Sequence, residues 1–453
     1  MAVAEADGAA MQQDIENTDW ETVLVGDAEN KAQALTSKLL SLQQLHVPSR
    51  QYLTRPTDPT WFGYRCRAAA EAKHAAWVRY KRHPSHHNKL LHREACKRVT
   101  ATCQWAVRKN REDLKKKLTG PGLGNKAWWT LVKERQGVGH QDAVPPLTRS
   151  DGSTATNSED KASLLAELFA KKMTVDHPER LPPRLPQETH RTVTTVAVTR
   201  EQVEKLLKAV EVGKATGPDH ISPRVLKHCA RELSGPLSDV FTSCVREKNW
   251  PSVWKEAQVV PVHKKNSRID PNNYRPISLL SVVGKIFEKI VAEVIWQHLT
   301  ENQLLSDTQF GFRPGRSTAD LLLLLSKDWQ DALDEGLDTL AVALDIAGAF
   351  DKVWHAGLFT KFHAKGVQGA LLQLLEDYLQ ERTLRVVIGG HSSRPSPVSA
   401  SVPQGSILGP LMWLVYMDDL LRQLSGLTVA AYGDDCTLYH SYCRSDSQRL
   451  STK

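Results

Sequence analysis

The sequence lacks any apolar stretch long enough to cross a bilayer. Its uniform leucine run, Leu321–Leu325, is far shorter than the roughly 20 apolar residues that a membrane-spanning helix needs. The start of the chain, "MAVAEADGAAMQQDIENTDW", is acidic and has neither an arginine-rich nor an apolar targeting segment. We therefore expect an intracellular protein, nuclear or cytoplasmic, that is neither secreted nor bound to a membrane.

Cysteine is scarce, and internal repeats are absent from the sequence. The 7 cysteines are scattered and odd in number, which argues against a disulfide framework and for a reducing compartment. The chain of 453 residues is 41% hydrophobic and 24% charged, which is typical of a globular protein with two or three domains.

The net charge of +8 is concentrated in one segment. Between Arg65 and Lys117 there are 16 Lys and Arg against 4 Asp and Glu, and Trp77, Tyr80 and Trp105 lie among them. The apolar positions of this segment have helical spacing. Basic charge with interleaved aromatic rings fits a nucleic-acid backbone, but a solvated charged helix that packs its tryptophans on a neighbour fits equally well. Both interpretations stay open.

Glycine, proline and serine clusters divide the chain into five parts. We expect a loosely ordered acidic N-terminus (1–47), a basic helical segment (48–118), a linker with short helices (119–200), and one continuous unit split into 201–340 and 341–453. The break "TGPGLGNK" and the connector "GVGHQDAVPPLTRSDGSTATNSED" punctuate the linker, whose helix "SEDKASLLAELFAKKM" is expected to be capped by Ser158. Alternating strands and helices are expected from about residue 200.

Three aspartates carry the chemical argument. "DTLAVALDIAGAFDKVWH" predicts a buried strand, Leu340–Leu344, that ends at Asp345 and turns toward a helix containing Phe350 and Asp351. "LTVAAYGDDCTLYH" predicts a hairpin in which Gly433 lets the chain bend before Asp434 and Asp435.

If the hairpin lies beside that strand, the three carboxylates converge, and two unit charges about 4 Å apart repel by about 4 kcal/mol at an effective dielectric near 20. Oxygen ligands alone select Mg²⁺ or Mn²⁺, and two such ions support nucleotidyl transfer.

A second pair of adjacent aspartates competes for this role. Asp418 and Asp419 in "WLVYMDDLL" also follow a tyrosine. The apolar positions from Leu408 to Leu424 recur with helical density and no turn residue interrupts them, which places this pair within a helix. We therefore favour Asp434 and Asp435.

Five blocks in fixed order resemble the reverse transcriptase of non-LTR (LINE-type, jockey-like) retrotransposons. They are "VVPVHKKNSRIDPNNYRPISLLSVVGKIFEKIV", "QFGFRPGRSTAD", "ALDIAGAFDKVWH", "SVPQGSILGPLMW" and "AAYGDDCTLY", and "KATGPDHISPRVLK" upstream is similar to the start of that domain. Any one block is weak, but five in this order over about residues 210–443 are specific.

The resemblance implies an α+β fold, the fingers and palm of a right-hand polymerase, in which helices back an antiparallel palm sheet. Residues 201–340 would be fingers-like and 341–453 the palm, preceded by the basic helical region. We expect the thumb to be missing, because the chain stops after the polar "RSDSQRLSTK".

The implied activity is RNA-directed DNA polymerase, transferring dNTPs to a DNA primer on an RNA template. A catalytically inactive truncated remnant with nucleic-acid binding only is the alternative.

Residue roles follow from the resemblance position by position. Asp345, Asp434 and Asp435 resemble the catalytic, metal-binding carboxylates, and the Ile346 carbonyl is a further implied ligand of the two ions. The implied nucleotide-binding residues are Lys264, Lys265, Arg275, Phe350, Gln404 and Gly405, and the implied template-binding residues are Arg313 and Arg316. The structural alternative is a charged turn for the lysines, a helix-entry turn for "PQG" and a plain loop for "GFRPGRST".

Phe350 bears on the sugar of the nucleotide. It follows Asp345 by five residues, where reverse transcriptases keep an aromatic residue that crowds the 2′ position. Viral RNA-dependent RNA polymerases, which share the "GDD" turn, carry an aspartate there that accepts a hydrogen bond from the 2′-hydroxyl. A phenyl ring cannot accept it, so we expect selection of deoxynucleotides. Burial in the core is the alternative for this ring.

Overall fold

The computed structural model describes residues 8–47, 58–59, 61–119, 128–129, 144–424 and 427–443. The described residues from 58 to 129 form one compact unit, and those of 8–47 and 144–443 form another. Three segments of the sequence analysis lie almost entirely outside the described residues: the break "TGPGLGNK", the start of the connector after it and the tail "RSDSQRLSTK".

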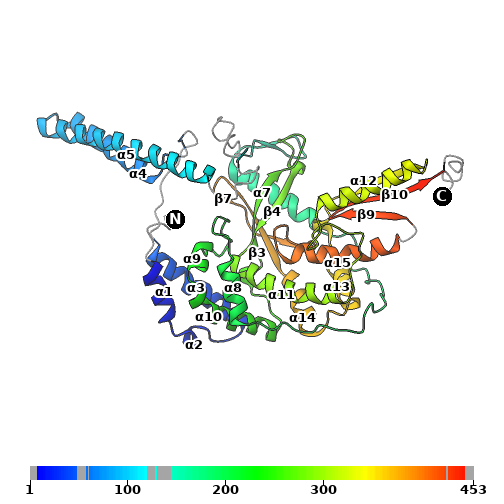
Figure 1. The fold of residues 1–453 in the computed structure, drawn as a ribbon. Helices are drawn as coiled ribbons and strands as arrows, with labels where there is room; N and C mark the ends of the chain where they lie inside the picture. The colour runs from blue at the N-terminus through cyan, green and yellow to red at the C-terminus, as the bar shows by residue number, and fades with distance from the viewer. Residues whose placement is uncertain are drawn as a thin grey trace. The chain divides into compact units, whose positions relative to one another are not determined.

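Helices dominate the first half of the described chain, and short runs of strands and helices alternate from about residue 256 onward (Figure 1). The helices are α1 (Gly8–Glu16), α2 (Trp20–Val23), α3 (Ala28–His46), α4 (Tyr64–Arg82), α5 (His86–Thr119), α7 (Ser158–Lys172), α8 (Arg200–Lys208), α9 (Pro223–His228), α10 (Ala230–Glu247), α11 (Val282–Glu301), α12 (Thr318–Asp334), α13 (His355–Ala364), α14 (Gly369–Leu379) and α15 (Leu408–Gln423). The strands are β1 (Leu147–Thr148), β2 (Thr154–Ala155), β3 (Glu256–His263), β4 (Tyr274–Leu279), β5 (Asp338–Asp345), β6 (Arg382–Ile388), β7 (His391–Ser392), β8 (Ser396–Val398), β9 (Thr428–Tyr432) and β10 (Asp435–Tyr442).

The first unit consists mainly of α4 and α5, which lie side by side. This confirms that the basic segment is helical. Cys66, Ala69 and Ala106 are buried between the two helices, whereas most of the other side chains are exposed. The Arg65 guanidinium lies 5.0 Å from the ring centroid of Trp105. The hairpin therefore has a thin core of small side chains and a basic surface.

The second unit is built on a core of helices. Side chains of α1, α3, α8–α11 and α13–α15 pack in one continuous cluster. The expectation of a loosely ordered N-terminus is wrong for residues 8–47, because α3 buries Ala28, Ala32, Leu35 and Leu39 along one face at helical spacing. Asp27 caps this helix by accepting a hydrogen bond from the Asn30 N–H.

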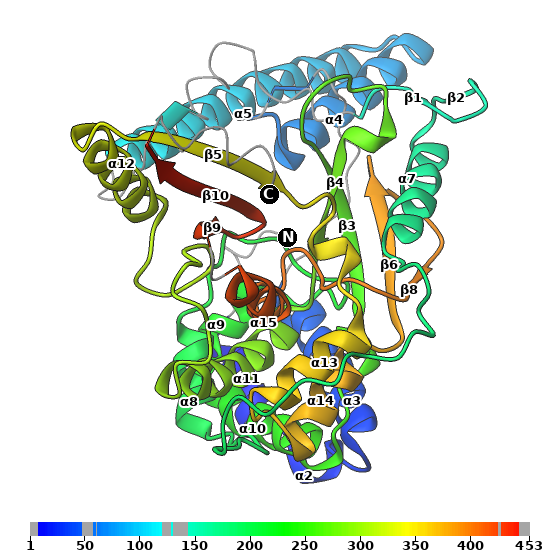
Figure 2. The same ribbon diagram turned by 90° about the vertical axis from the view of Figure 1, so that its right-hand side faces the viewer.

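A mixed sheet stands against this core in the strand order β4-β3-β6-β7, with β8 also paired to β6 (Figure 2). The β3–β4 pair is antiparallel, whereas the β3–β6 pair is parallel. Helix α7 covers one face, where Leu165 and Phe169 pack with Val259 and Val386. The expectation of a linker is thus wrong from residue 144 onward, because β1, β2 and α7 belong to this second unit. The expected N-cap of α7 is also wrong, because the capping residue is Asn157 and not Ser158.

The second main sheet is antiparallel, with the order β5-β10-β9. The predicted hairpin is confirmed: β9 and β10 pair in register from Tyr432–Asp435 outward, and Gly433 bends the chain at φ +69°. The predicted strand before Asp345 is also confirmed, but the prediction that this strand is buried is wrong. Leu340, Val342 and Leu344 are 54%, 46% and 46% exposed because β5 is an edge strand of this sheet.

Helix α12 packs on the sheet through Leu321 and Leu325, which contact Ala430 and Tyr439 (Figures 1 and 2). The molecule therefore combines helices with one mixed and one antiparallel sheet, which confirms an α+β architecture. Within the described residues, no helix is both long and apolar enough to span a membrane.

Candidate active site

A cavity of about 720 Å³ lies where the two main sheets approach each other. Its walls come from the ends of β3 and β5, from β4, from the hairpin turn, from the "PQG" loop and from the end of α7. The side chains and backbone that line it belong to Lys172, Lys264, Asn272, Tyr274, Arg275, Pro276, Ile277, Phe312, Asp345, Ile346, Ala347, Gly348, Ala349, Phe350, Asp351, Lys352, Gln404, Gly405, Ser406, Pro410 and Asp434.

The structure brings the predicted carboxylates to one place. Asp345 is the last residue of β5, and in the β5–β10 register its partner is Asp435. Asp434 occupies the hairpin turn and lines the cavity together with Asp345 and Ile346. Asp435 is exposed and does not line the cavity. Within the described residues, none of the three aspartates forms an ion pair with Lys, Arg or His.

This donor set fits a hard divalent cation. It offers carboxylate oxygens and the Ile346 carbonyl, without thiolate or imidazole in the cavity lining. Across the described part of the chain, no three carboxylate, imidazole or thiolate side chains are close enough to form a ready-made metal site. The carboxylates are therefore adjacent but not gathered into a closed cage.

Cationic side chains face the carboxylates from the other side of the cavity. The predicted Lys264 and Arg275 lie there, at the end of β3 and within β4. Lys172 of α7 also lies there, and the sequence analysis missed it. Burial lowers the pKa of Lys172, and the negative charges of Asp351 and Asp270 partly oppose that shift. We call the carboxylates of β5 and the hairpin turn the acidic wall of the cavity, and the cations of α7, of β4 and at the end of β3 its basic wall.

The "PQG" loop forms the floor of the cavity. The Gln404 Nε2 donates a hydrogen bond to Asp351 Oδ1 at 3.0 Å, and its backbone carbonyl accepts one from the Ser278 N–H at 2.8 Å. Gly405 has φ +111°, and a Cβ there would lie 2.7 Å from the Ser278 carbonyl oxygen. Only glycine fits this approach to β4. Burial raises the pKa of the Asp351 carboxyl, an effect that the Gln404 hydrogen bond opposes.

Phe350 both lines the cavity and contacts the core. It opens a short 3₁₀ turn, Phe350–Lys352, rather than the α-helix expected there; α13 begins only at His355. Its ring stacks on Trp413 at a centroid distance of 5.6 Å and meets Phe312 edge-on at 5.7 Å. Phe350 is therefore partly buried against the core and also lines the cavity, and its role beside the nucleotide sugar stays a prediction.

Besides Asp435, three predicted residues lie outside the cavity lining. Lys265 is exposed beyond the end of β3. Arg313 donates to the Ser306 carbonyl at 2.6 Å. Arg316 donates to the Gln309 carbonyl at 3.1 Å and forms an ion pair with Asp307 at 2.6 Å. Both arginines thus hold the loop before α12 together in this structure.

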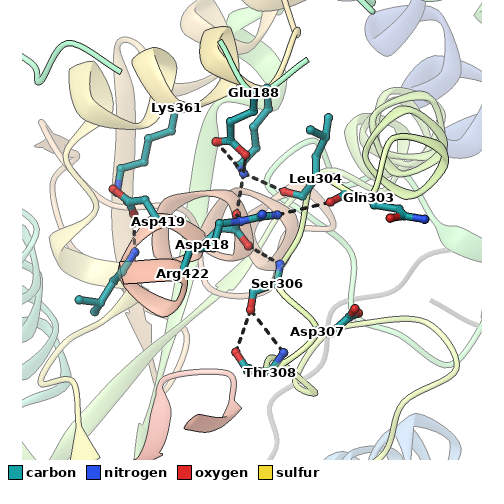
Figure 3. Close-up of polar contacts among 12 residues, drawn as sticks. Glu188, Gln303, Leu304, Ser306, Asp307, Thr308, Lys361, Asp418, Asp419 and Arg422 are labelled. Atoms are coloured by element: carbon teal, nitrogen blue, oxygen red, sulfur yellow. Dashed lines mark hydrogen bonds and ion pairs between the residues drawn. The ribbon is translucent and has the colours of Figure 1, made fainter. Parts of the chain in front are cut away.

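The competing pair lies in α15, as predicted (Figure 3). Asp418 is 2% exposed, and its carboxylate accepts hydrogen bonds from Lys365 Nζ at 2.6 Å and from Arg422 Nε at 2.7 Å. Asp419 forms an ion pair with Lys361 at 2.7 Å. Because cations already neutralise these carboxylates, this pair ties helices together rather than facing an open cavity.

Sequence reasoning missed Lys172, Lys352 and Phe312 among the lining residues, and it gave no role to Asp351. Asp351 follows Phe350 directly and could have been weighed with it. Lys172 had no comparable signal, because it ends a helix far from the five blocks in sequence.

The comparison with known proteins agrees with this geometry. Residues 262–452 match the family "Reverse transcriptase (RNA-dependent DNA polymerase)". Two relatives from Drosophila melanogaster are "Probable RNA-directed DNA polymerase from transposon BS", 30% identical over 67% of this chain, and "Probable RNA-directed DNA polymerase from transposon X-element", 28% identical over 82%. A third is "RNA-directed DNA polymerase from mobile element jockey" from the same organism, 32% identical over 53% of this chain.

These relatives are longer proteins. The aligned part covers 35% of the transposon BS protein, 42% of the X-element protein and 27% of the jockey protein. The chain thus spans less than half the length of these curated relatives.

Proposed function

Because residues 262–452 form a reverse transcriptase domain similar to those of non-LTR retrotransposons, we propose that this chain supplies the nucleotidyl-transfer site of an RNA-directed DNA polymerase. Its substrates would be dNTPs, a DNA primer and an RNA template. The observation that carries the proposal is the shared cavity of Asp345 and Asp434 with a basic wall opposite. An intracellular location, nuclear or cytoplasmic, follows from that activity.

The architecture supports a division into fingers and palm. We assign the antiparallel β5-β10-β9 sheet with α12 and α15 to the palm, within residues 341–453 and the helix before it. The β3–β4 pair, within residues 201–340, would be the fingers-like part that faces it. The cavity then lies between fingers and palm.

The acidic wall would hold the catalytic ions. Asp345, Asp434 and the Ile346 carbonyl would bind two Mg²⁺ or Mn²⁺ ions, with Asp435 adjacent in the β5–β10 register. When bound, such ions activate the primer 3′-hydroxyl and stabilise the leaving oxygen of an in-line displacement. The backbone fixes where these charges lie, because Asp345 ends β5 and Asp434 occupies the hairpin turn.

The basic wall would bind the incoming triphosphate. Lys264 and Arg275 would neutralise its oxygens, and the Arg275 guanidinium can bind two of them at once. Lys265 would assist from the neighbouring turn. The Gln404–Gly405 backbone, held against β4, would let the nucleotide approach closely. Arg313 and Arg316 would support the template only through the loop that they hold.

A primer-extension assay on an RNA template with Mg²⁺ tests the proposal. We expect the chain to add dNTPs and Asp434→Ala to lower the rate by at least about 100-fold, which is about 2.7 kcal/mol of transition-state stabilisation. Asp419→Ala is the matched control, because Asp419 lies in α15 with Lys361 and outside the cavity lining. Absence of incorporation by the unaltered chain, or equal losses in both variants, would refute the assignment.

A second function, nucleic-acid binding by the basic segment, is supported by one specific observation. The α4–α5 hairpin exposes most of its basic side chains, together with Trp77 and Trp105 at 44% and 38% exposure. We propose that this surface binds the RNA or DNA backbone, which is compatible with either a polymerase or a catalytically inactive remnant.

A further inference from the structure

Gln309 lies outside the cavity lining, yet its side chain is bonded to the acidic turn. It is 3% exposed. Its Oε1 accepts hydrogen bonds from the Gly433 N–H at 2.9 Å and from the Gly311 N–H at 2.8 Å. Its Nε2 donates to the Gly433 carbonyl at 3.1 Å. One carboxamide thus pairs with both backbone groups of the residue that precedes Asp434.

The chain around Gln309 reinforces this contact. The Phe310 N–H donates to the Ala431 carbonyl at 2.8 Å, and the Ala431 N–H donates to the Thr308 carbonyl at 2.9 Å. These bonds place residues 308–310 alongside β9 in a parallel bridge. At Gly311 a Cβ would lie 2.1 Å from the Gly433 nitrogen, so only glycine allows this approach.

The Gly433 carbonyl has a second donor on the opposite element. Trp413 of α15 donates its Nε1–H to it at 3.1 Å. The peptide bond that leads into Asp434 is therefore held from two sides, by the loop before α12 and by α15. Gly433 thus has both its own N–H and its carbonyl hydrogen-bonded in a buried setting, which leaves this residue of the turn little freedom to rotate.

The loop that carries Gln309 is itself fixed. Arg316 donates to the Gln309 carbonyl at 3.1 Å, and Arg313 donates to the Ser306 carbonyl at 2.6 Å. The Ser306 N–H in turn donates to the buried Asp418. The two arginines thus hold the loop together, and Asp418 connects it to α15.

We propose that Gln309 is a positioning residue for nucleotidyl transfer, which holds the Gly433 peptide so that Asp434 faces Asp345 before any ion binds. This inference rests on the proposed function. Two carboxylates at one site repel each other, and a turn at positive φ has few bonds of its own. Because the turn is already fixed, bound ions gain the full attraction of the carboxylates, and no binding free energy is lost in ordering the turn.

A purely structural role for Gln309 predicts different behaviour. A buried glutamine that only satisfies its own hydrogen bonds would, when replaced, lower the stability of the whole unit. A positioning residue instead changes the hairpin turn and the affinity for divalent ions while the remainder stays folded. Measurements at the turn and elsewhere in the same chain therefore separate the two roles.

The test uses the full chain with Gln309→Met, which keeps the length of the side chain and removes both hydrogen-bonding groups. We expect amide hydrogen exchange in peptides covering Thr428–Cys436 to accelerate by about tenfold or more, with no change in peptides covering β3 and β6. We also expect the Kd for Mn²⁺, measured by electron paramagnetic resonance, to rise by about tenfold. Gln330→Met, on the exposed face of α12, is the matched control.

Gln309→Glu gives a second readout that a structural role does not predict. The carboxylate form can accept from the Gly433 N–H but cannot donate to its carbonyl, whereas the protonated form can do both. We expect the Kd for Mn²⁺ of this variant to approach that of the unaltered chain as the pH falls. The same substitution at the control position, Gln330→Glu, should show no such convergence. Gln309→Glu also serves if Gln309→Met fails to fold.

The outcomes are distinguishable from failure of the proposed function. Unchanged exchange at the hairpin and unchanged Mn²⁺ affinity in both Gln309 variants would overturn the positioning role, whatever the activity. If these physical effects occur but the unaltered chain extends no primer, the proposed polymerase activity fails while Gln309 still fixes the turn. In an active chain, we expect Gln309→Met to raise the Mg²⁺ concentration needed for half-maximal rate and to leave the KM for dNTP within about twofold.

Discussion

At the residue scale, Phe350 is the residue that we expect to select dNTP over rNTP. Its ring lines the cavity and is held by Trp413 and Phe312, so it cannot turn away from a bound sugar without disturbing both rings. We expect Phe350→Val to lower the preference for dNTP over rNTP by at least about tenfold, because the space beside the 2′ position opens. Single-nucleotide incorporation with matched dNTP and rNTP measures this ratio.

Phe350→Tyr is the control for that experiment, since it keeps the ring and its stacking. Its preference for dNTP should stay within about threefold of the unaltered chain. Equal loss of preference in both variants would mean that the ring acts through the core and not through the sugar.

Single residues also mark the limit of prediction from the sequence. The positions of Asp345 and Asp434 could be anticipated, because strand ends and a tight turn are local patterns. Gln309 carried no such signal: it bonds Gly433 across 124 positions of the chain, and a buried glutamine looks like any loop residue in sequence. Lys172 reaches the cavity only because α7 packs on the mixed sheet.

At the element scale, the start of α15 depends on one buried carboxyl group. Glu288 of α11 is 2% exposed and accepts hydrogen bonds from the Ile407 N–H at 2.5 Å and the Leu408 N–H at 3.2 Å. Burial raises its pKa, although these bonds and the charge of Arg382 oppose the shift. The folded chain therefore holds this proton more tightly than the unfolded chain does.

The pH dependence of stability follows from that sign. The contribution of Glu288 is greatest below the unfolded carboxyl pKa, about 4.3, and declines as the pH rises through the folded pKa. We expect Glu288→Gln to flatten the decline of the unfolding free energy as the pH rises above the unfolded carboxyl pKa of about 4.3, by at most about 1.4 kcal/mol per pH unit. Urea denaturation at several pH values measures the unfolding free energy of the unaltered chain, of Glu288→Gln and of the control Glu301→Gln, which replaces an exposed residue. Parallel curves of unfolding free energy against pH for all three proteins would contradict the expectation.

Whole elements were predictable where their signal is local. The β9–β10 hairpin and α15 follow from turn chemistry and apolar spacing within a single window. Helix α3 has the same kind of spacing, from Ala28 to Leu39, but polar residues dominate the composition around it and hid the signal. The exposure of β5 could not be predicted, since an edge strand and a central strand share one apolar pattern.

At the scale of the whole molecule, the basic hairpin predicts how nucleic-acid binding responds to salt. Each phosphate contact on a single strand contributes about 0.7 to the slope of log K against log salt. We expect the triple change Arg108→Gln, Arg111→Gln and Lys116→Gln to reduce that slope by about 2, since all three side chains are exposed on α5. Fluorescence anisotropy with single-stranded RNA at several salt concentrations measures it.

The control for the salt experiment replaces three exposed lysines of the other unit, Lys205, Lys208 and Lys289, with glutamine. Both triple variants change the net charge equally, so a general charge effect lowers both slopes alike. A loss confined to the α5 variant assigns the contacts to the hairpin, and an unchanged slope in that variant removes the hairpin from the binding surface.

The continuous helical core has a practical consequence for where the protein can be truncated. Phe287 stacks on Phe241 at 4.9 Å and on Trp250 at 4.5 Å, and both partners precede residue 262, where the family likeness begins. A truncation placed at that boundary would strip the aromatic ring of Phe287 of its neighbours and remove Lys172 from the cavity. Homology limits and folding limits do not coincide in this chain, so expression trials should retain the upstream helices.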